Sequence, residues 1–147
     1  MCYLPLRLFT FNLPTAPSNQ KLPDVKYNVT IRRQVQNRHI EGTIEFNNYV
    51  QKLKDSGIKP GVLAKDIDAA ELINKFHKQG IYDPNPRDNS PREIVDVGKV
   101  VGKYWNTVTG QYNDTRFIEI VYSKAGAHIY PVRPPKGADD NEISGKI

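Results

Sequence analysis

The chain has 147 residues and a formal net charge of +5, which is enough for one domain with a core and favours an anionic partner. Its single cysteine, Cys2, excludes an internal disulfide framework and a cysteine-rich zinc site. No apolar run reaches the ~18 residues of a membrane helix, and the apolar start lacks the basic region of a signal peptide. We therefore expect no membrane partner.

The chain begins and ends with segments that do not read as folded structure. Residues 1–25 hold four prolines and predict an extended leader, with at most one short strand at residues 6–11. Residues 135–147 are polar and predict a flexible tail. The single domain is expected between them, at residues 26–134.

The helices are expected in the first half of this domain. Alternation predicts a strand at residues 27–33, and helical spacing predicts a short helix at 46–53. The clearest helix starts at Asp66 or Asp68, either of which can cap its first turn. Gly80 is expected to close that helix in a left-handed conformation.

The second half reads as sheet. β-branched runs at residues 94–105, 115–123 and 128–132 predict a three-stranded antiparallel meander. The fold class is therefore α+β, with a helical N-terminal half packed on a C-terminal antiparallel sheet.

Some residues could cut RNA without a metal, which requires a base, an acid and cations around the phosphate. His39 and His128 are the candidate proton carriers, because neutral and charged imidazole are both populated near neutral pH. If residues 124–126 form the hairpin loop, Tyr122 lies opposite His128, and Arg116 shares their face. If the loop is one residue longer, Ser123 takes that place. Taken alone, a solvent-facing hairpin histidine is the simpler interpretation of His128.

Other residues could hold a nucleic acid. Lys99 and Lys103 are four apart on one predicted strand and would form a basic face, although a merely solvated sheet face would look the same. The aromatic residues of this half could stack on bases or fill the core, and the core is favoured for Trp105. We find no metal-ligand spacing and no phosphate-binding glycine loop, so no metal or cofactor is expected.

Three blocks taken together resemble a known family. QNRHIEGTIEFNNY, IVDVGKVVGKYWNTVTGQYNDTR and YSKAGAHIYPVRP are similar to the bacterial polymorphic-toxin type 50 domain across residues 26–134. That family occurs at the ends of secreted toxins and of prophage head-associated proteins, and is assigned to the barnase, EndoU, colicin and RelE superfamily of ribonucleases. TIEFN after Gly42 is longer than the family's compact run. By position, the resemblance implies functional roles for His39, Thr115, Arg116, Tyr122, Ser123, Lys124 and His128.

The sequence thus predicts a metal-independent endoribonuclease toxin domain that leaves a 2′,3′-cyclic phosphate and a 5′-hydroxyl. His39 and His128 would transfer protons, and Arg116 and Lys124 would stabilise the phosphorane. Further hydrogen bonds would come from Tyr122, Ser123 or Thr115, and RNA would be held by Arg38, Lys99, Lys103, Tyr130 and Arg133.

The expected partners are RNA, such as tRNA or rRNA, and an acidic immunity protein that covers the basic cleft. The toxin would act in the cytoplasm of a target or host cell, carried there by a larger secreted or phage-borne protein.

Two other functions fit parts of the sequence. A non-catalytic nucleic-acid-binding or phage head-associated module would bind with steep salt dependence and release no product. An ADP-ribosyltransferase would use scattered Arg, Ser, Thr and Glu residues, but the Glu-x-Glu pair common in such enzymes is missing.

Overall fold

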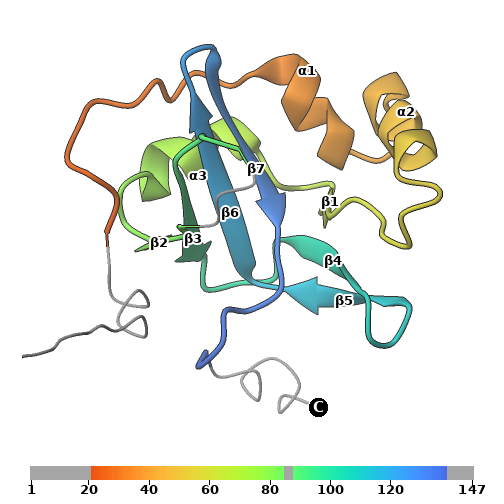
Figure 1. Ribbon diagram of the computed structural model, residues 1–147. Helices are drawn as coiled ribbons and strands as arrows, with labels where there is room; N and C mark the ends of the chain where they lie inside the picture. Colours follow the sequence, from red (N-terminus) through yellow and green to blue (C-terminus); the bar gives the residue numbers. More distant parts are fainter. Residues whose placement is uncertain (1–20, 85–87, 139–147) are drawn as a thin grey trace, which may run out of the picture.

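The computed structural model describes residues 21–84 and 88–138 (Figure 1). Within these ranges the chain is α+β, with three short α-helices and two antiparallel sheets. This confirms the predicted α+β class, whereas the helical N-terminal half is not confirmed, because the helices in the described part of that half are short. The predicted strand at 6–11 and residues 139–147 of the predicted tail lie outside the described residues.

The elements follow one another in two groups. The first half holds α1 (Arg33–Gln36), the 3₁₀ turn η2 (Asn37–His39), α2 (Ile44–Lys52), β1 (Val62–Leu63) and α3 (Ala69–Phe76). The second half holds β2 (Ile81–Tyr82), β3 (Arg92–Asp96), β4 (Gly102–Asn106), β5 (Gln111–Thr115), β6 (Phe117–Ser123) and β7 (Gly126–Pro131). The strands form a four-stranded sheet in the order β2-β3-β6-β7 and a three-stranded sheet in the order β1-β4-β5.

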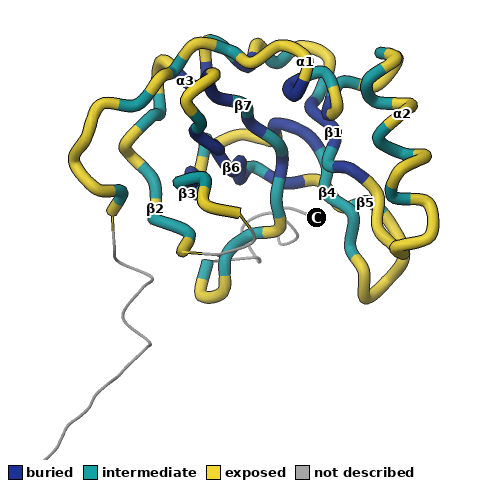
Figure 2. Tube along the Cα trace, turned by 45° about the horizontal axis from the view of Figure 1, so that its top comes forward, coloured by how far each residue is buried: buried dark blue, intermediate teal, exposed yellow. Residues whose placement is uncertain are grey.

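The core lies between α3 and one face of the four-stranded sheet. Asp68 caps α3 by accepting hydrogen bonds from the backbone N–H groups of Ala70 and Glu71, as the sequence predicted. Figure 2 shows that β6 and β7 carry long buried stretches. The buried residues of this core include Ala69, Leu72 and Ile73 of α3 and Ile118, Ile120, Tyr122, Ala127 and Ile129 of the sheet.

The free edge of β7 is covered by the segment that leads into α1. Ile31 forms an isolated parallel bridge to Ala127. Beyond it, the buried Gln36 amide takes both backbone groups of Ile129, accepting from its N–H at 2.8 Å and donating to its carbonyl at 2.8 Å. A side chain thus replaces a strand at this edge. Because α1 and η2 are held against β7, His39 is brought to the strand that carries His128.

The β6–β7 hairpin has a shorter loop than either alternative considered from the sequence. Ser123 pairs with Gly126, so only two residues connect the strands, and Val121 lies opposite His128. The prediction that Tyr122 or Ser123 lies opposite His128 is therefore wrong. Since side chains alternate between faces, Arg116 does not share a face with His128 either.

Three local predictions are corrected. The strand at 27–33 is reduced to the bridge at Ile31, because α1 begins at Arg33. The run at 94–105 divides at Gly98, whose φ of 88° turns the chain from β3 into the other sheet; Lys99 therefore lies outside a strand. Gly80 is not the left-handed cap of α3, because Lys78 takes that conformation, with φ 66°.

Candidate functional site

A polar cavity of about 420 Å³ lies between η2, α2, the loop at residues 57–61 and the β6–β7 hairpin. Its wall is rich in arginine, histidine and tyrosine, and carries one acidic residue among the described residues. The polar and charged lining residues are Arg32, Arg38, His39, Tyr49, Lys59, Asp88, Ser90, Arg92, Ser123, His128 and Tyr130.

His39 is held in one tautomer by the backbone. Its side chain is buried, at 5% exposure, and its Nδ1 lies 2.9 Å from the Gly61 carbonyl oxygen. Because a carbonyl can only accept, Nδ1 carries the proton and Nε2 carries the lone pair of the neutral ring. Burial lowers the pKa of His39 from 6.5 to about 4, so the ring is neutral at neutral pH.

His128 lies beside His39 with its ring almost parallel. The two centroids are 6.0 Å apart and the planes differ by 7°. The pKa of His128 falls to about 3, first because of burial and then because of electrostatic repulsion of its charged form by His39 and by three arginines, Arg38, Arg32 and Arg92. The histidine pair is therefore uncharged at neutral pH, inside a ring of permanent cations.

Two tyrosines complete an aromatic cluster around the histidines. The Tyr130 ring stacks on His39, with centroids 4.9 Å apart, and lies 6.0 Å from His128. Tyr49 from α2 meets His39 edge-on, with centroids 5.8 Å apart. The Arg38 guanidinium lies over the Tyr49 ring, 5.4 Å from its centroid. These contacts leave the imidazoles little freedom to rotate.

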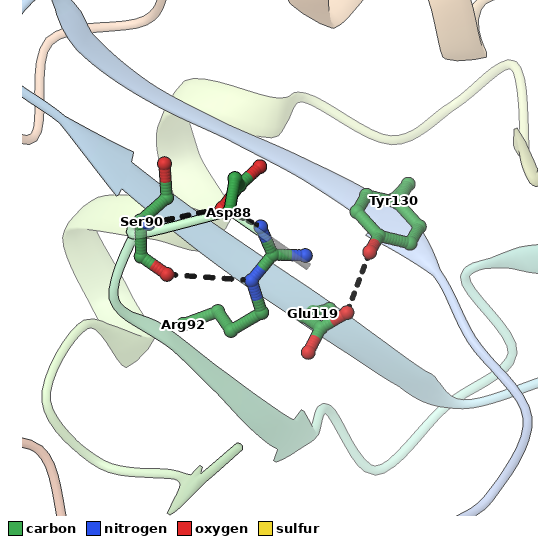
Figure 3. Close-up of polar contacts among 5 residues, drawn as sticks. All are labelled: Asp88, Ser90, Arg92, Glu119 and Tyr130. Atoms are coloured by element: carbon green, nitrogen blue, oxygen red, sulfur yellow. Dashed lines mark hydrogen bonds and ion pairs between the residues drawn. The ribbon is translucent and has the colours of Figure 1, made fainter. Parts of the chain in front are cut away.

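Arg92 places a buried guanidinium in the cavity wall. It begins β3 and is 4% exposed, and Nη2 donates to Asp88 at 2.7 Å while Nε donates to the Ser90 carbonyl at 3.4 Å (Figure 3). Register places Arg92 beside Val121 on β6, which in turn lies beside His128 on β7. Arg92 and His128 therefore share one face of the sheet.

Glu119 lies on the same face of β6, two residues before Val121, and pairs with Tyr130 on β7. Its Oε1 accepts from the Tyr130 hydroxyl at 2.5 Å (Figure 3). The pKa of Glu119 is raised to about 8, first by burial and then by hydrogen bonding to Asp83, whereas the Tyr130 hydrogen bond and the Arg92 charge act in the other direction. A protonated carboxyl group thus anchors the tyrosine that stacks on His39.

The loop at residues 57–61 is held by the three-stranded sheet. Trp105 Nε1 donates to the Gly57 carbonyl at 3.2 Å, and the Tyr112 hydroxyl donates to the Pro60 carbonyl at 2.9 Å. The two rings pack edge to face, with centroids 5.2 Å apart. Trp105 is half-buried against this loop and does not belong to the main core. Because Gly61 follows directly, this sheet fixes the carbonyl that sets the His39 tautomer.

The family model described as bacterial toxin 50 matches residues 31–131, from the bridge at Ile31 to the end of β7. The chain belongs to the bacterial toxin 50 family. This confirms the resemblance read from the three sequence blocks, and makes the chain a bacterial toxin domain. A search of curated proteins returned no match.

The cavity of this toxin domain brings together part of the predicted site. His39, His128, Arg38, Tyr130 and Ser123 all line it. The predictions for these five side chains converge in one place because residues 30–39 lie along β7. Their roles in catalysis remain predictions.

The remaining predicted residues lie elsewhere among the described residues. Arg116 forms an ion pair with Asp96 at 2.9 Å, and Tyr122 is 1% exposed in the core. The buried Thr115 donates its hydroxyl proton to the Val132 carbonyl at 2.8 Å. Lys103 belongs to the three-stranded sheet and lies over Tyr112 of the same sheet, 4.8 Å from the ring centroid. The exposed Lys99, Lys124 and Arg133 lie in connecting segments outside the strands.

Sequence reasoning missed Arg92 and Glu119. Both belong to strands that were predicted at least in part. With the correct register, both would have been placed on the face of the sheet that carries His128. The signal was the unusual position of charged residues in runs of β-branched residues, REIVD and FIEIV. A charge buried in a strand needs a partner or a function.

Neither metal binding nor membrane insertion has a structural signal in the described ranges. Among residues 21–84 and 88–138, no group of three or more His, Cys, Asp or Glu side chains is arranged to hold a metal ion. The helices of the same ranges are too short and too polar to cross a membrane.

Proposed function

We propose that this toxin domain is a metal-independent endoribonuclease that cleaves RNA by attack of the 2′-hydroxyl on the adjacent phosphorus. The observation that carries the proposal is the pair of parallel imidazoles, 6.0 Å apart, in a cavity lined by four arginine and lysine side chains, Arg32, Arg38, Lys59 and Arg92. The products would be a 2′,3′-cyclic phosphate and a 5′-hydroxyl end.

His39 is suited to be the general base. Its Nδ1 proton is committed to the Gly61 carbonyl, so Nε2 is the nitrogen that can accept the 2′-hydroxyl proton. A base must be unprotonated before the reaction, and burial keeps the pKa of His39 low, at about 4. Proton removal lets the 2′-oxygen form its bond to phosphorus.

His128 is suited to be the general acid once RNA is bound. Three arginine charges contribute to its low pKa in the empty cavity, and a phosphate that pairs with those arginines would cancel their effect. The phosphate charge would itself favour imidazolium. His128 could then give a proton to the 5′-oxygen as its bond to phosphorus breaks.

Arg92 and Arg38 would hold the phosphate. A guanidinium can donate two parallel hydrogen bonds to phosphate oxygens, and negative charge grows on these oxygens as the phosphorane forms. Arg92 is the better placed of the two to act in a dry environment, because it is buried and already oriented by Asp88 and Ser90.

Membership of the ribonuclease superfamily that includes barnase and RelE is part of this proposal, as the sequence resemblance implied. The proposal keeps the expected acidic immunity protein, since a surplus of cations around the cavity would attract an acidic partner. It also keeps the cytoplasm of the target cell as the place of action, because RNA is there.

Incubation of the purified chain with tRNA and total RNA in EDTA tests the proposal. Cleavage with cyclic phosphate ends is expected, and His39→Ala and His128→Ala should each lower the rate by about 10²- to 10⁴-fold. His77→Ala is the matched control, because His77 lies at the end of α3 and contacts the Ile73 carbonyl there.

Intact RNA under all conditions would contradict the proposal. Salt-sensitive RNA binding without products would instead favour the non-catalytic binding module. Cleavage that survives both histidine substitutions would retain a ribonuclease but reject this mechanism.

A further inference from the structure

A second hollow adjoins the candidate active site. It encloses about 570 Å³ at the end of the β6–β7 hairpin, and two residues, Ser90 and Ser123, line both spaces. The shared wall is fixed, because the Ser123 hydroxyl donates to the Gly126 carbonyl at 2.8 Å. A flexible chain could therefore run from one hollow into the other without leaving the surface.

The second hollow has the lining that a nucleotide needs. Lys26 and Lys124 are exposed cations on it, and no described residue of its wall is acidic. Asn28 and Asn89 contribute amides, which can donate to and accept from base edges. Tyr27 contributes an aromatic wall.

This wall is already organised. The Tyr27 ring packs on Tyr122 with centroids 4.6 Å apart, and its hydroxyl donates to the Pro23 carbonyl at 3.0 Å. Asn28 Nδ2 donates to the Lys124 carbonyl at 3.1 Å, which ties the segment before α1 to the hairpin turn. A preformed pocket loses less entropy on binding than one that must assemble.

We propose that this second hollow is a subsite for the nucleotide one step beyond the two that flank the scissile phosphate of a single-stranded RNA. The inference rests on the proposed ribonuclease function and deepens it by naming the substrate class. Proteins read single-stranded RNA by combining aromatic walls, amides directed at base edges and cations along the backbone, and these three kinds of group meet here. A base that is paired in a duplex could not leave its stack to enter the hollow without an energetic cost.

The proposal predicts that a dinucleotide is a poor substrate. A dinucleotide fills the cavity around its one phosphate but leaves the second hollow empty. Addition of one nucleotide on the correct side should raise kcat/KM roughly tenfold, the scale of one base in such a site. The same linkage inside a stable hairpin stem should be cut more slowly than in an open strand.

Oligonucleotides with one cleavable linkage provide the test. We would measure kcat/KM for the dinucleotide and for versions lengthened by one nucleotide on either side, with the native chain and with the double variant Lys26→Ala/Asn89→Ala. The gain from lengthening should be largely lost in this variant. Lys65→Ala/Asn113→Ala is the matched control, since both residues are exposed and lie outside either hollow.

Binding of non-cleavable 2′-O-methyl oligonucleotides separates this inference from the proposed function. A gain in affinity with length that is reduced by Lys26→Ala/Asn89→Ala and retained by the control supports the subsite, even in a chain that cuts no RNA. A gain that is absent, or equal in both double variants, overturns it, and tight binding of duplex RNA in preference to open strands does so as well.

Discussion

Each face of the four-stranded sheet carries a tyrosine that donates to a buried glutamate at 2.5 Å. On the core face the pair is Tyr122 and Glu93, and on the cavity face it is Tyr130 and Glu119. The residue types and hydrogen-bond lengths are the same, but the surroundings differ. These surroundings decide what each pair can do.

Glu93 is stabilised by backbone donors. In addition to Tyr122 it accepts from the N–H groups of Lys78 and Gly80, each at 2.7 Å, and it is fully buried. The glutamate connects the end of α3 to β3. We therefore infer that the Tyr122–Glu93 pair stabilises the fold and takes no part in the cavity.

Glu119 instead meets a second carboxyl group, Asp83, and its pKa is raised to about 8. Its tyrosine lines the cavity and stacks on His39. The role of a tyrosine in these strands therefore depends on the face of the sheet that its side chain occupies. Because side chains alternate between faces, Tyr122 on β6 points to the core and Tyr130 on β7 points to the cavity.

The largest difference in activity between a cavity variant and a variant outside the cavity is expected for Arg92 and Arg116. Arg92→Gln should lower kcat/KM for RNA by about 100-fold, because a guanidinium facing the developing charge is removed. Arg116→Gln should change it less than about threefold, since its guanidinium is paired with Asp96 away from the cavity. Steady-state kinetics on one oligonucleotide measures both, and the reverse order would restore the role predicted from the sequence for Arg116.

The two tyrosines should separate activity from stability. Tyr122→Phe should lower the free energy of unfolding by about 1.5–3 kcal/mol, because a buried bond to a carboxylate is lost. Tyr130→Phe should lower kcat roughly tenfold, because the ring beside His39 loses its anchor. Urea denaturation and RNA cleavage of both variants check this, and a Tyr122→Phe chain that is fully stable but inactive would contradict it.

The buried histidines and the buried glutamate of the cavity should affect the pH dependence of stability in opposite directions. His39 and His128 have lowered pKa values, of about 4 and 3, so their contribution is present above pH 6.5 and is lost as the pH falls. Glu119 has a raised pKa of about 8, so its contribution is present below about pH 4.5 and is lost as the pH rises through 8. Among these three groups only Glu119 titrates between pH 6.5 and 8, and it should make stability fall there.

Thermal unfolding across this range tests the assignment. The native chain should lose stability from pH 6.5 to 8, whereas Glu119→Gln should stay constant within about 0.5 kcal/mol. Glu41→Gln is a control, because Glu41 is exposed. Equal slopes for the native chain and Glu119→Gln would show that Glu119 is not the group that titrates.

The smallest effect is expected from the loop that sets the His39 tautomer. Tyr112→Phe removes the donor to the Pro60 carbonyl and should lower kcat by about threefold, because the Gly61 carbonyl is held less firmly. Nitrogen chemical shifts of the His39 ring should show more of the second tautomer. A rate change without a change in these shifts would reject the role assigned to the loop.

Much of the local structure followed from the sequence. Apolar spacing and a capping aspartate located α3, and turn residues separated β6 from β7, because these signals act over a few residues. The family could also be predicted from the sequence, since the resemblance depends on the order of short sequence blocks. The histidine pair could be nominated because few other side chains change charge near neutral pH.

The face of each strand was decided only in the folded chain. A hairpin loop one residue shorter than assumed moved Tyr122 away from His128 and placed Val121 opposite it, because side chains alternate with a period of two. Likewise, the sequence predicted a basic strand before His39. In the fold this segment enters α1 instead, and the Gln36 amide makes the hydrogen bonds to the edge of β7. The residue types, their order and the helix signals were thus determined by the sequence alone. Which of the charged residues meet in the cavity depended on register and on an edge contact between positions 93 residues apart, and neither leaves a local pattern.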